Sequence, residues 1–327
     1  MPLPALADDE VLVRVRACGI CGSDVHGYDG STGRRIPPLV MGHEAAGEVE
    51  RTGRGVLGFD RGDRVTFDST VWCGTCEYCA RGASNLCTNR RVLGVSCGDY
   101  RRHGAFAEFV SVPGRILHKL PPAMPFEHAA LVEAVSVAVH AVKRAAPRPD
   151  DTVAVIGCGM IGLLIIQVLR HRGCTRTIAI EIDERRRALA ARFGASATIQ
   201  PASGSVAGEV RRLTDSRGAD HVFEVVGHSG TVGDAVASVR RGGTVTLVGN
   251  LAPHVDLPLQ AVVTGELTLL GSCASSGEYP EAIDLVARGE IDVAPLISAV
   301  APLAEGATWF SRLHTPNGGL MKVILRP

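Results

Sequence analysis

Hydrophobic and polar positions follow two different patterns along the chain. Near the N-terminus, EVLVRVRA at residues 10–17 alternates apolar and polar positions, which is typical of a strand with one buried face. In the middle of the chain, short apolar runs such as VAVI at 153–156 and TIAI at 177–180 alternate with helical segments. This βα alternation predicts an α/β fold with a doubly wound parallel sheet.

Residues 151–173 combine a strand, a glycine turn and a helix. The spacing G-x-G-x-x-G follows the apolar strand at once and opens an apolar helix that ends near Gly173. In this context the spacing is typical of a dinucleotide-binding turn, because the pyrophosphate can approach the free N–H groups of the helix N-terminus. The candidate turn comprises Gly157, Gly159, Met160, Ile161 and Gly162.

An acidic residue follows at the spacing that a ribose contact requires. Glu181 ends the second strand, 19 residues after Gly162. Its carboxylate would accept hydrogen bonds from the hydroxyls of NAD and repel the 2′-phosphate of NADP, which predicts NAD as the cofactor. We interpret Arg185 and Arg187, in the helix that follows, as a solvated helix face.

Three further buried strands are predicted at 221–227, 242–250 and 267–273. Ligands of a doubly wound sheet lie outside the C-terminal ends of the strands. The residues at these ends are therefore candidates for lining the cofactor groove: Val226, Gly227, Val248, Gly249, Asn250 and Cys273.

Composition excludes several classes of partner. Of the 327 residues, 46% are hydrophobic, and 34 Lys and Arg balance 34 Asp and Glu. A neutral chain has no electrostatic reason to bind nucleic acid or an anionic membrane. The N-terminus lacks the basic and apolar regions of a signal peptide, and no apolar run reaches the ~18 residues of a membrane helix. We therefore expect a cytoplasmic enzyme.

Four of the ten cysteines lie within sixteen residues, with the spacing C-x2-C-x2-C-x7-C. Such thiols can form disulfides, act as a redox pair, hold a nucleic-acid zinc ribbon or bind a structural metal. In a reducing cytosol a metal site is favoured over disulfides, and four thiolates form a closed tetrahedral zinc site with no open position. The ligands of this predicted structural zinc are Cys73, Cys76, Cys79 and Cys87.

A second metal site is predicted from residues 17–30 and 38–53. The first segment contains Cys21, and the second contains His43 and Glu44 side by side. A cysteine, a histidine and a carboxylate can hold zinc and leave one position open, which is the pattern of a catalytic site.

At these residues the chain resembles the zinc-dependent medium-chain dehydrogenases. The resemblance rests on CGICGSDVH, GHEAAGEV, GDRV, the four-cysteine segment and GAFAEFV, and it continues almost to the C-terminus. It implies a GroES-like β-rich catalytic domain at 1–130 and 276–327 and a Rossmann NAD-binding domain at 131–275, with the active site in the cleft between them. Relatives usually begin with an additional strand pair before the segment that matches EVLVRV. Either this pair is absent, which would leave a sheet edge unpaired, or the start codon is misassigned.

The resemblance also implies the roles of individual residues. Cys21 and His43 match the first two ligands of the catalytic zinc. Glu133 stands where the alcohol branch has a cysteine ligand, as in the sorbitol or polyol branch, and binds zinc directly or through water. Glu44 is then a second carboxylate that can exchange at the metal.

Residues around these ligands match further functional positions of the family. Asp24 would receive the second N–H of His43. Ser23 would take the proton of the substrate hydroxyl and pass it through the cofactor ribose toward His26. Arg186 matches a position near the adenosine ribose.

The resulting hypothesis is a zinc-dependent oxidoreductase, with two zinc ions per chain, that transfers a hydride from a secondary alcohol to NAD. The expected small-molecule substrate is a polyol or sugar alcohol, phosphorylated forms included. Arg101, Arg102 and His103 are candidates for bringing charge to it, but we interpret them as an ordinary solvated loop. An L-threonine 3-dehydrogenase-like enzyme or a general alcohol dehydrogenase is the alternative within the class. A non-catalytic regulator that binds NAD and zinc is the alternative outside it. The family suggests a homodimer or homotetramer.

Overall fold

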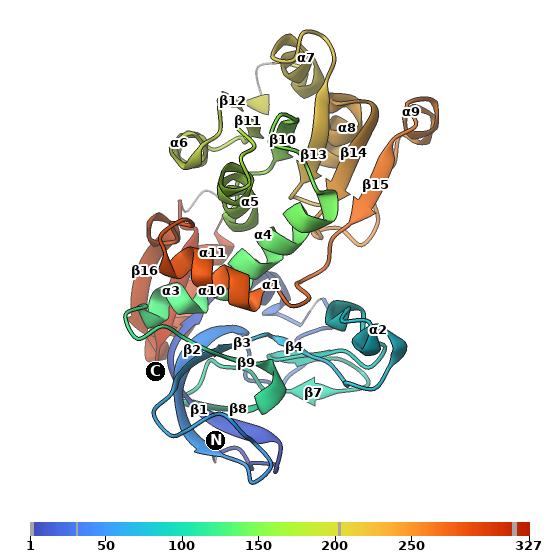
Figure 1. Cartoon of the computed structure of the whole chain (residues 1–327). Helices are drawn as coiled ribbons and strands as arrows, with labels where there is room; N and C mark the ends of the chain where they lie inside the picture. Colours follow the sequence, from blue (N-terminus) through green and yellow to red (C-terminus); the bar gives the residue numbers. More distant parts are fainter. Residues whose placement is uncertain (1–2, 31, 202–203, 316–318) are drawn as a thin grey trace. The chain divides into compact units, whose positions relative to one another are not determined.

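The computed structural model describes residues 3–30, 32–201, 204–315 and 319–327 (Figure 1). The chain divides into two compact units. The first combines Met1–Ser136 with Ser275–Pro327, and the second is Val137–Ala274. The chain leaves the first unit inside a helix and returns to it directly after Ala274.

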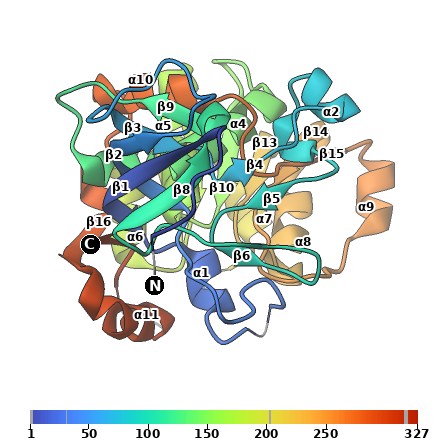
Figure 2. The same ribbon diagram turned by 90° about the horizontal axis from the view of Figure 1, so that it is seen from below.

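A mixed sheet organises the first unit. Among the described residues it has seven strands in the order β16–β17–β1–β2–β3–β9, and β8 also pairs with β1. β1 and β8 lie side by side in Figure 2. The strands are β1 (Glu10–Gly19), β2 (Glu44–Thr52), β3 (Arg64–Phe67), β8 (Phe109–Pro113), β9 (Leu117–Lys119), β16 (Ile297–Pro302) and β17 (Lys322–Arg326).

Alternation in β1 explains its place in the sheet. Val11, Val13 and Val15 are buried in a core cluster with Val65 and Phe67 of β3. On the opposite face Arg14 and Arg16 are more accessible, and Leu12 is buried. Full burial of one such side chain stabilises the folded state by about 1.5–3 kcal/mol relative to leaving it exposed.

Short elements complete the first unit. The elements that carry candidate ligands are α1 (Gly22–Gly27), α2 (Glu77–Ala80), η1 (Ser84–Leu86) and α4 (Val132–Ala145). The others are β4 (Thr70–Val71), β5 (Arg91–Val92), β6 (Val95–Ser96), β7 (Arg101–Arg102), η2 (Gly114–Ile116), α3 (Phe126–Ala130), α10 (Tyr279–Ala287), η4 (Ala294–Leu296), η5 (Leu303–Glu305) and α11 (Gly306–His314).

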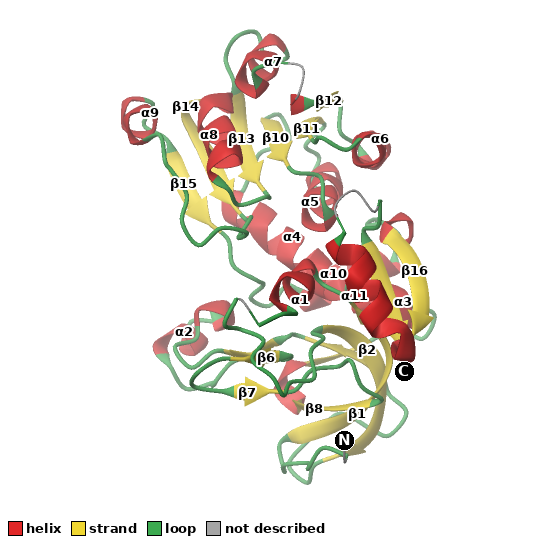
Figure 3. Ribbon diagram, turned by 180° about the vertical axis from the view of Figure 1, so that it is seen from behind, coloured by secondary structure: helices red, strands yellow, loops and turns green. Residues whose placement is uncertain are grey.

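The second unit contains the predicted parallel sheet, which is confirmed. Six strands of the described residues are paired in parallel in the order β12–β11–β10–β13–β14–β15 (Figure 3). β10 is buried at every position, as expected of a strand covered on both faces. The strands are β10 (Thr152–Ile156), β11 (Arg176–Ile180), β12 (Ala197–Ile199), β13 (Ala219–Glu224), β14 (Val239–Leu247) and β15 (Thr268–Gly271).

The strand order reverses between β10 and β13, and sheets of this kind typically bind ligands at such a switch point, outside the C-terminal ends of the strands. Right-handed crossovers place the helices that follow β10 and β11 on one face and the helix that follows β13 on the other. The helices are α5 (Met160–His171), α6 (Glu184–Phe193), α7 (Val206–Arg212), α8 (Ser229–Ser238) and α9 (Leu259–Thr264). None of the helices in the described ranges is both long and apolar enough to cross a membrane.

Candidate active site and metal centres

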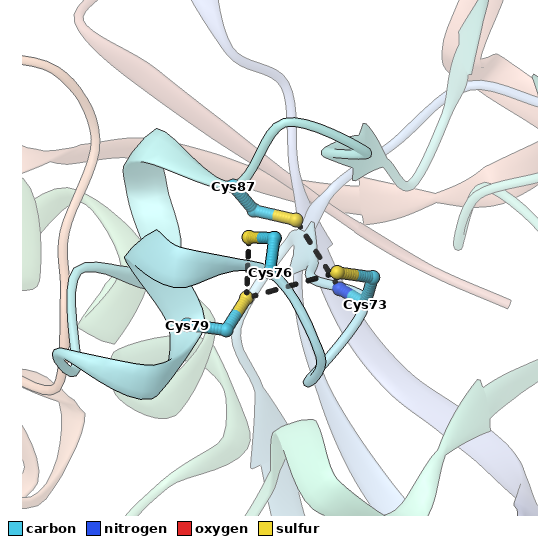
Figure 4. Close-up of side chains that lie close together, drawn as sticks. All are labelled: Cys73, Cys76, Cys79 and Cys87. Atoms are coloured by element: carbon cyan, nitrogen blue, oxygen red, sulfur yellow. Dashed lines mark hydrogen bonds between the residues drawn. The ribbon is translucent and has the colours of Figure 1, made fainter.

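The four clustered cysteines converge in a small lobe of the first unit (Figure 4). Cys76 caps α2, Cys79 lies within it, and Cys87 follows η1. Their Sγ atoms and that of Cys73 all lie within 4.8 Å of one another. The Sγ of Cys76 is 3.5 Å from that of Cys79, and the Sγ of Cys73 is 4.0 Å from it.

Backbone amides point at these sulfurs. Cys87 Sγ accepts from the N–H groups of Cys73 and Asn89, both at 3.3 Å. Hydrogen bonds from Thr75 lower the pKa of Cys73 to about 7, and those from Cys79 and Thr88 lower the pKa of Cys76 to about 5. Four converging sulfurs, two of them biased toward thiolate, fit a closed Zn²⁺ site.

The second candidate group is Cys21, His43 and Glu44, whose ligand atoms also lie within 4.8 Å of one another. Cys21 ends the loop after β1 and caps α1, His43 directly precedes β2, and Glu44 is the first residue of β2. Pairing of β1 with β2 places Gly19 opposite Glu44, and this register brings the two segments together. The thiol, imidazole and carboxylate are the donor set of a catalytic zinc.

Asp24 connects two of these ligands. The carboxylate is fully buried; its Oδ2 accepts from the backbone N–H of Cys21 at 3.2 Å, and its Oδ1 lies 3.4 Å from His43 Nδ1. That nitrogen is buried and has no well-aligned hydrogen bond among the described residues. Burial lowers the pKa of His43, but the negative charges of Asp24 and Cys21 outweigh it and raise the pKa well above its usual value. The negative charges around the imidazole thus favour a positive charge at this position, either a proton on His43 or a bound metal ion.

Glu44 is held by a buried lysine that the sequence did not reveal. Lys322 Nζ, on β17, lies 2.5 Å from Glu44 Oε2 and donates to the carbonyl oxygen of Ile20 at 3.0 Å. Both side chains are at most 3% exposed. Glu44 can therefore reach a metal with its other oxygen, Oε1, whereas Oε2 would have to leave Lys322 or be shared with it.

Glu133 lies in the first turn of α4 and outside the close group of ligands. Its Oε1 accepts from Ser69 Oγ at 3.4 Å. Burial, together with the negative charge of Glu44, raises the pKa of Glu133 to about 7 despite the opposing effect of His43. Its role as a ligand stays a prediction.

Ser23 and His26 lie on α1, three residues apart, and both are exposed, whereas Asp24 between them is buried. Residues at this spacing are neighbours on a helix surface. Ser23 Oγ accepts a hydrogen bond from Arg35 Nη2 at 3.2 Å. Arg35, like Lys322, was missed: nothing in the loop sequence RRIPP indicates which arginine is buried.

Arg101, Arg102 and His103 are used within the fold rather than left free for a substrate. Arg101 donates to Ser96 Oγ at 3.4 Å, Arg102 pairs with Glu10 at 2.7 Å, and His103 Nδ1 accepts from a backbone amide at 3.1 Å.

Burial of Asp68 predicts that the stability of the folded chain depends on pH. It lies just after β3, is buried, and accepts from the N–H of Thr70 at 2.8 Å; burial raises its pKa from 3.8 to about 6. The folded chain therefore binds a proton that the unfolded chain releases between these pH values, so stability falls as pH rises from about 4 to 6, by ~3 kcal/mol at ~1.4 kcal/mol per pKa unit. We expect Asp68→Asn to remove this loss and raise stability at neutral pH.

Urea unfolding at pH 4.5 and 7.5 measures this effect. Asp99→Asn is the matched control, because Asp99 is exposed and its replacement should change neither stability nor its pH dependence. A pH dependence as steep in Asp68→Asn as in the control would contradict the expectation.

The glycine turn of the second unit has the shape of a phosphate cradle. A Cβ at Gly162, in the first turn of α5, would lie 1.9 Å from the carbonyl oxygen of Gly157, so only glycine fits at this position. Gly159 caps α5, and a Cβ there would meet nothing within 4 Å, which leaves the N-terminus of α5, with Met160 and Ile161 in its first turn, open to a ligand. This geometry fits a dinucleotide.

Glu181 points back at this turn. Its Oε2 accepts from the N–H of Cys158 at 2.8 Å, and its Oε1 accepts from the N–H of Asp183 at 3.0 Å. The backbone N–H of Arg186 is capped by Asp183, and the positive charge of its half-buried side chain acts on Cys158 of the glycine turn. The interpretation of Arg187 as solvated is wrong: it donates to the carbonyl oxygens of Glu181 and Ile182, because the helix turns this residue toward the end of β11.

The remaining cofactor candidates lie after the C-terminal ends of three strands. Glu224 ends β13, and its Oε1 accepts from the N–H groups of Val226 and Gly227 at 3.0 and 2.8 Å. Val248, Gly249 and Asn250 follow β14, and exposed Cys273 follows β15. The N–H groups of Val248 and Gly249 donate to the carbonyl oxygen of Glu224, which ties the first two loops together.

Two family models match the chain. The alcohol dehydrogenase GroES-like domain matches residues 7–122, and the zinc-binding dehydrogenase model matches residues 161–288. These matches agree with the presence of a β-rich unit and a parallel-sheet unit.

Individual proteins are similar over the whole chain. Sorbitol dehydrogenase of Bacillus subtilis strain 168 is 32% identical, covering 100% of this chain and 93% of its own. A solved zinc-binding dehydrogenase of Sinorhizobium meliloti 1021, bound to NADP, has 33% identity and a TM-score of 0.91, covering 100% and 94%. Galactitol-1-phosphate dehydrogenase of Escherichia coli has 29% identity and a TM-score of 0.92, covering 100% and 95%.

Proposed function

Because the chain belongs to the zinc-dependent medium-chain dehydrogenase family, in its polyol dehydrogenase branch, we propose that it oxidises a secondary hydroxyl of a polyol or sugar alcohol with NAD. The convergence of Cys21, His43 and Glu44, which matches an open zinc site, carries the proposal. Relatives that act on sorbitol and on galactitol 1-phosphate support a polyol substrate, with or without a phosphate.

We assign the catalytic role to residues 1–130 and 276–327 and nucleotide binding to residues 131–275. Cys21 and His43 would hold the catalytic zinc together with Glu133, direct or through water, and Glu44 would exchange there. Zinc bound at this site would act as a Lewis acid on the substrate hydroxyl, and NAD would accept the hydride. The four cysteines of the lobe would hold the second, structural zinc.

The proton has to leave through the chain's own groups. Ser23, exposed on α1, would accept the proton of the substrate hydroxyl, and His26 on the same helix face would deliver it to solvent. Asp24 would keep the ring of His43 in the orientation that presents Nε2 to the metal, because Nδ1 faces the carboxylate.

The test is production of NADH by the zinc-loaded protein with a panel of alcohols. The panel comprises sorbitol, galactitol, a sugar-alcohol phosphate, threonine and ethanol. We expect the highest kcat/KM for a polyol or its phosphate. A preference for ethanol would refute the polyol assignment, a preference for threonine would favour the alternative enzyme, and no turnover of any alcohol would favour a regulator.

Cofactor choice is tested at Glu181. The wild-type protein should prefer NAD over NADP in kcat/KM. We expect Glu181→Gln to reduce this ratio by at least tenfold, since it removes the charge that repels a 2′-phosphate while keeping an acceptor for the N–H of Cys158. Glu184→Gln, at an exposed position in the first turn of α6, is the control and should leave the ratio unchanged.

We further propose a homodimer or homotetramer in the cytoplasm. β15 is the last strand of its sheet, and exposed apolar side chains lie just before it, among them Leu259 and Val263 at 63% and 65% exposure. All ten cysteines are free thiols, which suits a reducing compartment. Light scattering during size-exclusion chromatography would decide the oligomeric state.

A further inference from the structure

We infer that Arg35 is a positioning residue that holds the two halves of the proposed active site together, the ligands Cys21 and His43 through Asp24 and the proton acceptor Ser23 directly. The inference rests on the proposed function for the role of Ser23, whereas the anchoring of the ligands requires only that the site binds zinc.

Arg35 is an unusual arginine for a surface loop. Its side chain is 6% exposed, whereas the neighbouring Arg34 is exposed. Its backbone forms an isolated parallel bridge with Ser96, and its stem packs on the end of α1, where a Cβ at Gly27 would lie 2.6 Å from Arg35 Cγ. The fold thus makes room for this side chain at the helix that carries Ser23 and Asp24.

Most hydrogen bonds of the guanidinium go to side chains of that helix. Nε and Nη2 lie 3.4 and 3.2 Å from Asp24 Oδ1, and Nη2 is also 3.2 Å from Ser23 Oγ. The remaining hydrogen bond is within the loop itself, from Nη1 to the carbonyl oxygen of Arg34 at 3.2 Å. One planar group therefore fixes a buried carboxylate and a hydroxyl at once.

Asp24 transmits this constraint to both ligands. Its Oδ2 accepts from the backbone N–H of Cys21, and its Oδ1 faces the Nδ1 of His43. A buried carboxylate without its cation rotates toward water or draws in another charge. Loss of Arg35 would therefore loosen the thiolate and the imidazole together, although Arg35 touches neither.

Arg35 also sets the direction in which Ser23 can pass a proton. A serine hydroxyl has one donor and two acceptor lone pairs. Arg35 can only donate, so it occupies one lone pair and leaves one acceptor and one donor free. Ser23 then has one position to receive the proton of the substrate hydroxyl and one to hand a proton on.

The experiment compares Arg35→Met and Arg35→Lys with the control Arg34→Met in the full, zinc-loaded chain. The first readout is the rate at which zinc passes to the chromogenic chelator 4-(2-pyridylazo)resorcinol, which requires no substrate. Loss of a residue that orients metal ligands typically weakens binding by about ten- to a hundredfold. We expect one of the two zinc ions to leave Arg35→Met about tenfold faster than wild type, and Arg34→Met to match wild type.

The second readout is kcat at saturating alcohol, with excess zinc so that the site stays filled. We expect Arg35→Met to lower kcat at least tenfold with the KM for NAD unchanged, because Ser23 loses its fixed orientation. Equal zinc release in Arg35→Met and Arg34→Met would overturn the anchoring of the ligands, and equal kcat would overturn the role at Ser23.

Arg35→Lys covers the case in which Arg35→Met does not fold. Lysine keeps the charge but has one nitrogen in place of three, so it cannot make all the contacts to Asp24, Ser23 and Arg34. We expect faster zinc release or lower kcat, and wild-type values of both would overturn the inference. If no alcohol is oxidised by the wild-type protein but zinc leaves Arg35→Met faster, the anchoring stands and the proposed function fails.

Discussion

Replacing Cys76 with serine is expected to reduce the zinc content from two ions per chain to one and to unfold the lobe around residues 73–87. The lobe has almost no core of its own: α2 buries no residue, and η1 buries only Asn85. Metal–thiolate bonds must therefore supply most of its stability, and structural zinc typically contributes ~10–16 kcal/mol to small sites of this kind.

Limited trypsin digestion measures the unfolding directly. Arg81 is exposed at the end of α2, where the folded lobe resists cleavage, and we expect rapid cleavage after it in Cys76→Ser. Cys97→Ser is the matched control, since Cys97 belongs to neither ligand group, and it should keep two zinc ions and wild-type resistance. Two zinc ions in Cys76→Ser would mean that the four thiols do not form a single closed site.

Unfolding of the lobe should also reach the segment where the chain returns to the first unit. Ser276 Oγ donates to the carbonyl oxygen of Gly82 at 2.7 Å and accepts from the N–H of Ser84 at 3.0 Å. Hydrogen exchange at residues 275–278 should therefore increase in Cys76→Ser. The same protein should keep its second zinc, because none of the close ligands of that site lies in the lobe.

The sequence predicted the parts of the fold that depend on local spacing. The glycine turn 157–162 and the cluster 73–87 each place all their functional atoms within a few residues, so residue types and intervals were sufficient. The apolar runs at 153–156 and 177–180 likewise became the adjacent strands β10 and β11, because strands buried on both faces have few alternatives.

Side-chain partners that come together from distant segments could not be predicted in this way. Lys322 meets Glu44 across 278 residues, through pairing of β17 with β1, and a single lysine in MKVIL carries no sign of its partner. Arg35 and Arg34 are equivalent in sequence, and only the packing against α1 distinguishes them. Arg187 was wrongly interpreted as solvated, because the direction in which each side chain of a polar helix points depends on the residue at which the helix begins.

The buried pair of Lys322 and Glu44 gives the second large expected effect. We expect Lys322→Met to destabilise the chain by about 3–5 kcal/mol, because it leaves the carboxylate of Glu44 buried without its cation and the carbonyl of Ile20 without its donor. Urea unfolding of the metal-free protein measures this. Lys119→Met is the matched control: Lys119 pairs with Asp63 at 2.8 Å but is 54% exposed, and such surface pairs contribute about 0–1 kcal/mol.

Zinc should then rescue the variant more than it stabilises the wild type. Without Lys322, Glu44 has no cation to hold it, and the nearest place for one is the metal position beside Cys21 and His43. A zinc ion there would neutralise the carboxylate, so the increase in unfolding midpoint on adding zinc should be larger for Lys322→Met than for wild type or Lys119→Met. Lys322→Met combined with Glu44→Gln should lose this extra increment and recover part of the metal-free stability, since no uncompensated charge remains. An equal zinc increment in all variants would mean that Glu44 stays away from the metal, and that Lys322 stabilises the fold without controlling access of Glu44 to the site.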